Sequence, residues 1–321
     1  MDRTEMMPRN LLYLRAIHEH GSFTRAAEAL NVSQPTLSQQ IKQLEESLES
    51  QLVDRAGRQV RLTDAGEIYL SHVCRALSEL SAGTRAIKDV QDLSRGVLRL
   101  GWTPITNCLT CSLLSEFNRR FPGIGLTATE LPQIDLEAAV ASSRVDIGIA
   151  FSEPTSALKN SNGITSFTLF EDTLSLAVGV QHRLASREFP ITPEEQGDLQ
   201  LGLLNSDFAL RRMLDEYFSE HDIAPQVVME SNSLNAIIEI VRLGSTVTVL
   251  PNKLVVSCEG FRSLEATTPL PRHKVSLIWH QGRYMSAAAR AFKEMGMEWS
   301  RSLAQEDAGA KKEANCIAKR F

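Results

Sequence analysis

Residues 21–48 read GSFTRAAEALNVSQPTLSQQIKQLEESL, and this stretch decides how the first part of the chain folds. Its apolar residues recur at helical spacing in two runs, with a corner at Asn31, a residue type that tolerates the left-handed backbone conformation. Ser33 is a suitable N-cap for the second run, and Pro35 is tolerated in its first turn. The pattern predicts two short helices joined by a tight turn, a helix-turn-helix. The apolar positions are Phe23, Ala26, Ala27 and Leu30, then Leu37, Ile41, Leu44 and Leu48.

The polar face of the second predicted helix offers hydrogen-bonding groups and has no carboxylate before Glu45. Such a face suits a helix that enters the major groove of DNA, although an ordinary packing hairpin is the alternative. Glutamine pairs with adenine through two hydrogen bonds, and arginine holds phosphates. We therefore predict base contacts from Gln34, Thr36, Ser38, Gln39 and Lys42, phosphate contacts from Thr24, Arg55 and Arg58, and Ser33 and Pro35 at the DNA-facing end of the helix.

The flanking residues complete a domain that we expect to span residues 9–62. Residues 9–19 predict a first helix that packs on the helix-turn-helix. Residues 52–62 predict two short strands around a turn at Ala56-Gly57, which is a wing whose arginines can reach phosphate or the minor groove. A solvated hairpin without DNA contacts is the alternative.

A long helix is expected over residues 63–92, because Thr63 is a good N-cap and Asp64 and Glu67 carry negative charge in the first turn. Its apolar positions step by four and three, which is the spacing of a coiled-coil seam, so we predict a homodimer formed through this helix. Burial against the protein's own second domain is the alternative. The seam positions are Tyr69, Val73, Ala76, Leu80, Gly83, Ile87 and Val90.

After a break at residues 93–96, predicted strands and helices alternate from residue 95 to residue 302, which is typical of a mostly parallel α/β sheet. The last amphipathic helix is expected over residues 286–302. The polar tail, residues 303–321, is expected to be disordered. The fold class is therefore α+β overall, with a helical DNA-binding domain before an α/β domain.

Composition excludes several classes of protein. The 321 residues contain 43% hydrophobic and 23% charged residues, as an ordinary globular protein does. No run is apolar enough to span a membrane, the N-terminus lacks the pattern of a secretory signal, and five cysteines suggest reduced thiols, so we expect a cytoplasmic protein. Residues 1–95 hold 12 basic and 13 acidic side chains, so net charge does not reveal the DNA partner.

The order of residues adds a more specific signal. Gly21-Ser22-Phe23, Ser33-Gln34-Pro35 and Leu62-Thr63-Asp64-Ala65-Gly66 resemble the N-terminal signature of LysR-type transcriptional regulators, and the resemblance extends from about Arg9 to about Ser302. Within that family, the sequence most resembles regulators of cyanate utilisation. The resemblance implies two lobes of periplasmic-binding-protein type in residues 95–302, divided near residues 153–165 and 264–271, with a ligand cleft between them.

The resemblance also implies partners and a mechanism. A homodimer, or a tetramer as in the family, would bind an interrupted palindrome in double-stranded DNA, with RNA polymerase as a further candidate partner and no membrane partner. A small-molecule effector, expected to be an anion, would bind the cleft and change the lobes and the angle between DNA-bound dimers. We expect neither a cofactor nor a metal.

Ligands of α/β sheets bind where strands end and helices begin. Residues 103–107 are the first such corner, where we expect free amides to open a helix at Cys108. Resemblance to a family whose effectors contact this loop favours a ligand role over simple helix capping. The predicted effector-binding residues are Thr103, Thr106, Asn107, Phe151, Asn205, Asp207, Phe208, Asn232, Ser233 and Thr248.

Cys108 and Cys111 would share one face of that helix, and a thiol at a helix N-terminus is acidified. A redox switch or a soft-metal sensor is therefore an alternative to simple packing. Two other functions compete with regulation: a solute-binding transport protein and an α/β enzyme. The helix-turn-helix argues against the first, and the absence of nucleophile-elbow, phosphate-loop and zinc motifs argues against the second. We expect no catalytic residues.

Overall fold

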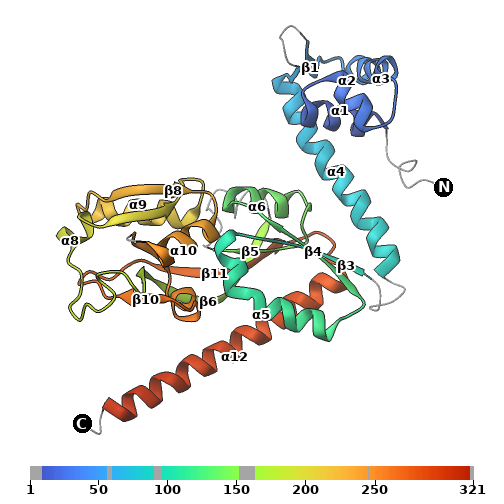
Figure 1. The fold of residues 1–321 in the computed structure, drawn as a ribbon. Helices are drawn as coiled ribbons and strands as arrows, with labels where there is room; N and C mark the ends of the chain where they lie inside the picture. Colours follow the sequence, from blue (N-terminus) through green and yellow to red (C-terminus); the bar gives the residue numbers. More distant parts are fainter. Residues whose placement is uncertain (1–8, 56–59, 90–95, 152–162, 245, 319–321) are drawn as a thin grey trace. The chain divides into compact units, whose positions relative to one another are not determined.

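The computed structural model describes residues 9–55, 60–89, 96–151, 163–244 and 246–318, which form two compact units divided after Val90 (Figure 1). The first unit contains α1 (Arg9–His20), α2 (Phe23–Ala29), α3 (Gln34–Ser47), β1 (Val53–Asp54), β2 (Arg61–Leu62) and α4 (Asp64–Asp89). Leu14, Ile17, Leu37 and Ile41 are fully buried in its core. The predicted helix-turn-helix is α2 and α3.

Local backbone chemistry fixes the turn between these helices. Asn31 adopts a left-handed conformation, with a φ of 52°, as expected for the corner. The Ser33 hydroxyl accepts a hydrogen bond from the Thr36 N–H at 3.2 Å, so Ser33 is the N-cap of α3. In the wing, β1 and β2 pair antiparallel with Val53 opposite Leu62, whereas the predicted turn at Ala56-Gly57 lies outside the described residues.

Helix α4 begins as predicted, because the Thr63 hydroxyl accepts a hydrogen bond from the Gly66 N–H at 3.0 Å. Leu70, Val73 and Leu77 pack into the core of the same unit. One residue of the predicted seam, Val73, is therefore already buried within its own unit. The later seam residues Ala76, Leu80 and Gly83 are exposed, whereas the side chains of Ile87 and Val90 are outside the described part of the chain.

The second unit alternates strands and helices. Its elements are β3 (Gly96–Trp102), α5 (Pro104–Arg120), β4 (Ile124–Glu130), α6 (Gln133–Ala141), β5 (Ile147–Ala150), β6 (Ile164–Gly179), α8 (Pro193–Gly197), β7 (Gln200–Leu204), α9 (Ala209–Glu220), β8 (Gln226–Ser231), α10 (Leu234–Leu243), β9 (Thr248–Pro251), α11 (Asn252–Ser257), β10 (Phe261–Leu264), β11 (Arg272–His280) and α12 (Ala287–Ala318).

The main sheet has the order β10-β6-β11-β5-β3-β4, and β9 also pairs with β6. The expectation of a mostly parallel sheet is wrong for it. Strand β3 runs parallel to β4 and β5, but β11 is antiparallel to β5 and β6, and β6 is antiparallel to β9 and β10. The reason is that the chain crosses along β6 and returns along β11, and two strands running out and back must be antiparallel.

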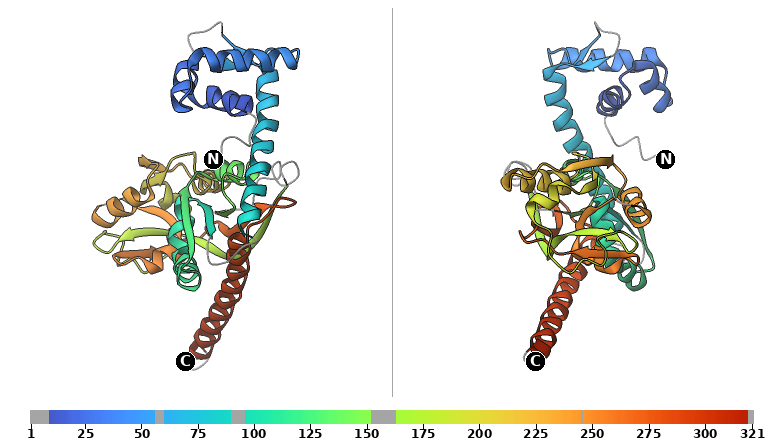
Figure 2. Two further views of the ribbon diagram at one scale, coloured as in Figure 1. Left: turned by 90° about the vertical axis from the view of Figure 1, so that its right-hand side faces the viewer. Right: turned by 60° about the vertical axis from the view of Figure 1, so that its left-hand side comes forward.

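Strand β6, the long yellow-green strand in Figure 2, contributes to two cores. Leu169 and Phe170 of β6 pack with β3, α5 and α12, whereas Leu174 and Leu176 of the same strand pack with β7, α9 and α10. We call the first group of elements lobe 1 and the second lobe 2. Ile105 and Phe151 belong to lobe 1 in sequence but are buried in the core of lobe 2. The lobes therefore meet through apolar side chains.

The end of the chain differs from the sequence prediction. Helix α12 does not stop at residue 302 but continues to Ala318, so residues 303–318 are helical rather than disordered. Alanine, glutamate and lysine dominate this segment, and these residues favour helix even without an apolar face. Among the described helices, none is long and apolar enough to cross a membrane.

Candidate nucleic-acid interface and effector pocket

The N-terminal half of α3 presents the predicted base-contacting residues to solvent. Gln34, Pro35, Thr36 and Gln39 are exposed, and Ser38 is half-buried. They remain accessible because the buried face of the helix is formed by Leu37, Ile41 and Leu44. Within the described part of the chain, neither Gln34 nor Gln39 makes a side-chain hydrogen bond, so both amides are available to base edges. Thr24 on α2 is exposed as well.

Several other polar side chains at the start of α3 and along it already make hydrogen bonds or ion pairs with one another. The hydroxyl groups of Ser33 and Thr36 hydrogen-bond each other at 2.7 Å. Gln40 donates to Gln43 at 3.0 Å, and Lys42 lies 3.7 Å from Glu46. Because the carboxylates begin only at Glu45, the electrostatic field of this face favours DNA at the N-terminal half of the helix.

Glu45 joins α3 to the wing. One of its carboxylate oxygens accepts hydrogen bonds from the N–H groups of Leu52 and Val53, at 2.9 and 3.0 Å. The other accepts from Arg55 at 3.2 Å, and the Arg55 guanidinium also lies 5.1 Å from the centre of the Phe23 ring. Arg55 is thus positioned at the edge of the wing while 42% of its side chain stays exposed. The predicted phosphate contact Arg58 lies outside the described residues.

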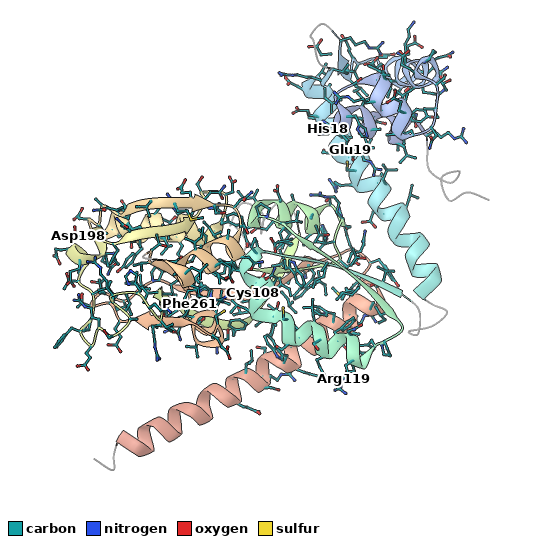
Figure 3. The ribbon with its side chains drawn as sticks, in the orientation of Figure 1. His18, Glu19, Cys108, Arg119, Asp198 and Phe261 are labelled. Carbon is teal, nitrogen blue, oxygen red and sulfur yellow. The ribbon has the colours of Figure 1, made fainter. Side chains whose placement is uncertain are left out.

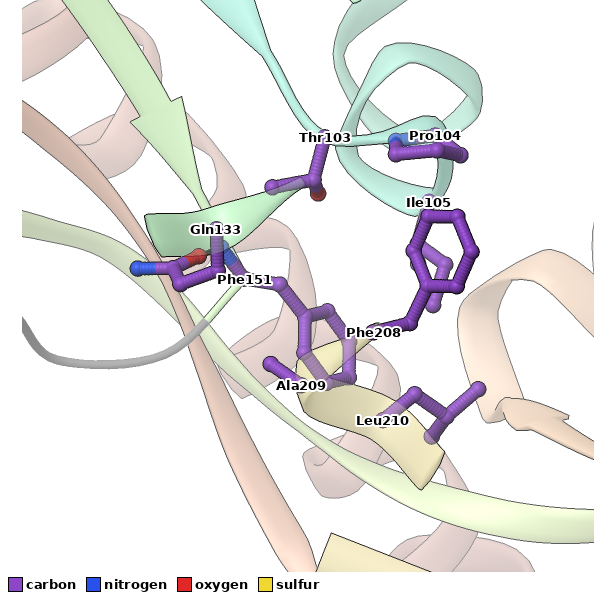
Figure 4. A pocket seen from close by; sticks show the side chains of 8 residues that line it. All are labelled: Thr103, Pro104, Ile105, Gln133, Phe151, Phe208, Ala209 and Leu210. Carbon is purple, nitrogen blue, oxygen red and sulfur yellow. Dashed lines mark hydrogen bonds between the residues drawn. The ribbon is translucent and has the colours of Figure 1, made fainter. Parts of the chain in front are cut away.

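In the second unit, a small pocket lies where the lobes meet (Figure 4). Its volume is about 10 Å³, which is room for roughly one water molecule. The aromatic rings of Phe151 and Phe208 form much of its wall. Three predicted effector residues line it, namely Thr103, Phe151 and Phe208, together with Pro104, Ile105, Gln133, Ala209 and Leu210, which the sequence prediction did not include.

Two helices, one from each lobe, begin at this pocket. Helix α5 begins at Pro104 with Thr103 as its N-cap, so the expected start at Cys108 is wrong by four residues. Pro104 opens α5 because proline is favourable at the first helical position, where its missing N–H is not needed. Helix α9 begins at Ala209, and its N-cap residue Phe208 makes no capping hydrogen bond with its side chain. Both helix dipoles favour an anion here. At α5, however, Pro104 has no N–H and the Thr103 hydroxyl already accepts from the Thr106 N–H, so the uncapped start of α9 offers the backbone donors for a carboxylate.

Behind the pocket, Phe151 and Gln133 are held by the fold. The Gln133 side chain accepts a hydrogen bond from the Phe151 N–H at 3.1 Å and donates one to the buried carboxylate of Glu137 at 2.7 Å. The Phe151 ring stacks on the buried imidazole of His273, with 4.5 Å between ring centres and 19° between planes. Burial lowers the pKa of His273 to about 4, so the ring is neutral near pH 7.

The remaining predicted effector residues lie elsewhere. Thr106 is buried, and its hydroxyl accepts a hydrogen bond from the Thr103 N–H at 3.0 Å as part of a capping box, which matches the capping alternative. The same hydroxyl donates to the Ile149 carbonyl oxygen at 2.9 Å. The amides of Asn107 and Asn205 donate to Glu130 and to Asp207, at 2.6 and 3.0 Å. The Ser233 hydroxyl caps α10, with Asn232 exposed beside it, and Thr248 is buried on β9. None of these residues lines the described pocket.

The thiol of Cys108, labelled in Figure 3, lies on α5, and it is not acidified. Because α5 begins four residues earlier than expected, Cys108 lies in its second turn. Burial, with Cys111 and Cys258 as further contributors, raises its pKa to about 11. The basis of the redox alternative, a low pKa at a helix N-terminus, is therefore wrong. Among the described residues, no group of histidine, cysteine, aspartate and glutamate side chains could hold a metal ion.

A signal for some of the missed pocket residues exists in the sequence. The pattern Thr103-Pro104-x-Thr106 combines an N-cap residue with proline at the first helical position, which predicts a helix start there. Ala209 and Leu210 follow the strand end at Leu204 and open the next helix. Gln133 has no such signal, because only the folded chain brings it to the backbone of Phe151.

Comparison with known proteins covers both units. Residues 8–67 match the model of the bacterial regulatory helix-turn-helix proteins of the LysR family, and residues 91–301 match that of the LysR substrate binding domain. A probable RuBisCO transcriptional regulator from Gracilaria tenuistipitata var. liui is 31% identical over 291 residues, covering 88% of this chain and 93% of that protein. The uncharacterised HTH-type regulator YybE of Bacillus subtilis strain 168 is 27% identical, covering 88% and 96%.

Solved structures show the same fold. A full-length OxyR variant from Pseudomonas aeruginosa matches with a TM-score of 0.64 and 24% identity, covering 91% of this chain and 93% of that chain. CbnR in complex with its target DNA matches with a TM-score of 0.63 and 18% identity, covering 92% and 99%.

Proposed function

Because the chain belongs to the LysR family of bacterial transcriptional regulators, we propose that its α3 helix reads an operator and that the pocket between its lobes binds the effector. The family confirms the predicted class, a DNA-binding transcriptional regulator rather than an enzyme. The observation that carries the effector proposal is the convergence of two helix N-termini, one from each lobe, on one pocket.

The DNA contacts we propose follow the accessibility of the side chains. Gln34 and Gln39 have free amides on the exposed face of α3 and are assigned to base edges. Thr36, Ser38 and Lys42 are assigned to the same groove, and Thr24, Arg55 and Arg58 to phosphates. The pairing of Arg55 with Glu45 supports a positioning function, since it holds the guanidinium at the start of the wing.

The effector we propose is a small organic anion. The two helix N-termini favour negative charge, whereas the rings of Phe151 and Phe208 and the side chain of Leu210 favour an apolar body. The pocket has room for about one water molecule, so an effector must separate the side chains that now fill it. Effector binding would therefore move the two lobes apart at their apolar contact.

The assembly we propose is a homodimer through the exposed part of α4, which includes Ala76, Leu80 and Gly83. Two copies would present two α3 helices to an interrupted palindrome, since a two-fold dimer needs two half-sites. Three further proposals rest on the family resemblance alone. They are that the chain forms a tetramer, that it contacts RNA polymerase, and that it most resembles regulators of cyanate utilisation. We place the site of action in the cytoplasm, where bacterial DNA lies.

One experiment tests both halves of this proposal. The full chain is used to select its operator from random DNA, and its thermal stability is then screened against small carboxylates and inorganic anions. We expect a palindromic site and at least one anion that raises the melting temperature. The variant Ala209→Asp should lose the anion response, because its carboxylate repels an anion at the N-terminus of α9 while suiting the helix. An anion that stabilises this variant equally would contradict the assigned pocket.

A further inference from the structure

Arg55, the predicted phosphate contact at the edge of the wing, is held by two side chains that come from the helix-turn-helix. Its Nη2 atom donates a hydrogen bond to the Glu45 carboxylate of α3 at 3.2 Å. Its guanidinium carbon lies 5.1 Å from the centre of the ring of Phe23, the first residue of α2. A free arginine side chain samples many rotamers, so these two contacts restrict where the guanidinium lies.

The two supports are themselves fixed relative to the wing. The Glu45 carboxylate also accepts hydrogen bonds from the N–H groups of Leu52 and Val53, at the start of the wing. On the other strand of the wing, the Val60 N–H donates to the carbonyl oxygen of Gly21 at 3.2 Å, two residues before α2 begins. The wing is thus hydrogen-bonded both to α3 and to the approach to α2, and the guanidinium has a defined position relative to the recognition helix.

Packing alone does not call for an aromatic ring at position 23. Phe23 is half-buried and packs at the edge of the core of the first unit, as the aliphatic side chains of Leu30 and Val32 also do. An aliphatic side chain would cover apolar surface there equally well. What it cannot supply is the negative face of a π system, which attracts a guanidinium. The ring at position 23 is therefore explained better by Arg55 than by the core.

The held guanidinium remains available to DNA. A guanidinium has five N–H groups, and among the described residues Arg55 donates a hydrogen bond only to Glu45. Thr24, the predicted phosphate contact on α2, directly follows Phe23 and is exposed. The Phe23 ring thus brings the cation of the wing to the end of α2 that carries the other predicted phosphate contact.

We propose that Phe23 is a positioning residue of the DNA interface, whose ring, together with the Glu45 carboxylate, holds the Arg55 guanidinium where the wing and the start of α2 bind DNA phosphates. The inference rests on the proposed phosphate contact of Arg55 and deepens it. Phe23 acts through Arg55 and raises affinity because a side chain that is already held loses less conformational entropy on binding. Since phosphates carry no sequence information, the gain is the same for every DNA sequence.

The test is a double-mutant cycle in the full chain, with Phe23→Leu and Arg55→Gln. Leucine keeps an apolar contact with the core and removes the ring. Phe23→Leu alone should weaken binding to the selected operator and to scrambled DNA about two- to fivefold, which corresponds to one exposed cation–π contact. When Arg55→Gln is already present, Phe23→Leu should have no further effect, because the guanidinium that the ring holds is gone. Fluorescence anisotropy gives the four affinities.

Two further variants separate positioning from folding. Phe23→Tyr keeps a π face for the guanidinium and should bind DNA as the wild type does. Tyr13→Leu also removes an aromatic ring from the core of the first unit, but Tyr13 is buried and makes no cation–π contact among the described residues. This control should lower the melting temperature and leave the DNA affinity of the folded protein unchanged.

The outcomes distinguish this inference from the proposed phosphate contact. If Phe23→Leu weakens DNA binding equally with and without Arg55, the ring only supports the fold and the inference is wrong. Wild-type affinity in Phe23→Leu would overturn it as well. If Arg55→Gln changes neither the affinity nor its salt dependence, the phosphate contact itself is wrong and the inference falls with it, whereas the base contacts proposed for α3 are unaffected.

Discussion

A Cβ atom at Gly66 would lie 2.0 Å from the carbonyl oxygen of Leu52, so the first turn of α4 and the start of the wing touch through backbone. Gly66 is therefore required by packing rather than by backbone conformation. Gly66 is the last residue of the Leu62-Thr63-Asp64-Ala65-Gly66 pattern. The close contact with Leu52 explains why that position holds glycine.

The variant Gly66→Ala should destabilise the first unit by about 1–3 kcal/mol or more, because a backbone carbonyl cannot move aside cheaply. Gly83 is the matched control, measured at a dilution that keeps the chain monomeric because Gly83 lies on the proposed dimer surface. No atom of the same chain lies within 4 Å of its Cβ position, so Gly83→Ala should then stabilise α4 by roughly 0.5–1 kcal/mol. Urea denaturation followed by hydrogen exchange in residues 9–89 measures both. Equal stability of the two variants would refute the packing argument.

Gln34→Ala should weaken binding to the selected operator by about 1–3 kcal/mol and leave non-specific binding unchanged. The free amide of Gln34 can form two hydrogen bonds to one base, whereas Gln43 already pairs with Gln40. Gln43→Ala should therefore have a small effect. Fluorescence anisotropy measures the affinity of each variant for operator DNA and for scrambled DNA. A loss of affinity for scrambled DNA alone would contradict a base contact by Gln34.

Arg55→Gln should change the salt dependence of DNA binding. If Arg55 neutralises one phosphate, the slope of log K against log salt falls by about 0.9, with discrimination between sequences retained. Arg55 itself is largely exposed, and glutamine can still donate a hydrogen bond to Glu45, so the fold should tolerate the change. Titrations at several KCl concentrations give the slope, and an unchanged slope would mean that Arg55 only supports the wing.

The buried His273 predicts a pH dependence of stability. Its pKa is about 4 in the folded chain and near 6.5 when unfolded, so below pH 6.5 the unfolded state takes up a proton that the folded state does not. Stability should thus fall as pH falls, by about 2 kcal/mol between pH 7 and pH 5. Thermal unfolding of wild type and His273→Phe across this range tests the assignment, because the variant should lose that part of the slope.

The Cys108 thiol should react slowly with iodoacetamide. A pKa near 11 instead of 9.0 leaves about a hundredfold less thiolate at pH 8. Mass spectrometry of the alkylated full chain between pH 7 and pH 10 gives the rate. Fast modification, or a disulfide formed under mild oxidation, would restore the redox alternative.

Local signals allowed prediction of the DNA-binding part from the sequence. The corner at Asn31, the cap at Ser33 and the apolar spacing of α3 each depend on residues within a few positions of one another. Helix α10 depends on equally local signals, since the Ser233 hydroxyl caps it and Leu234, Ile237, Ile238 and Val241 recur at helical spacing.

The pocket could not be predicted in the same way. Phe151 and Phe208 were placed at strand ends, but their meeting depends on how β6 and β11 carry the chain between the lobes. The antiparallel pairing of those strands, the helix α11 and the stack of Phe151 on His273 are all consequences of long-range contacts. Local periodicity contains no information about such contacts.

The central claim is that one pocket between the lobes controls how α3 and its copy hold DNA. The most direct measurement is the footprint and bend angle of the selected operator bound by the full chain, with and without the anion that most raises its melting temperature. We predict that both change in the wild type and neither changes in Ala209→Asp. An identical footprint and bend with the anion bound to the wild type would contradict the account.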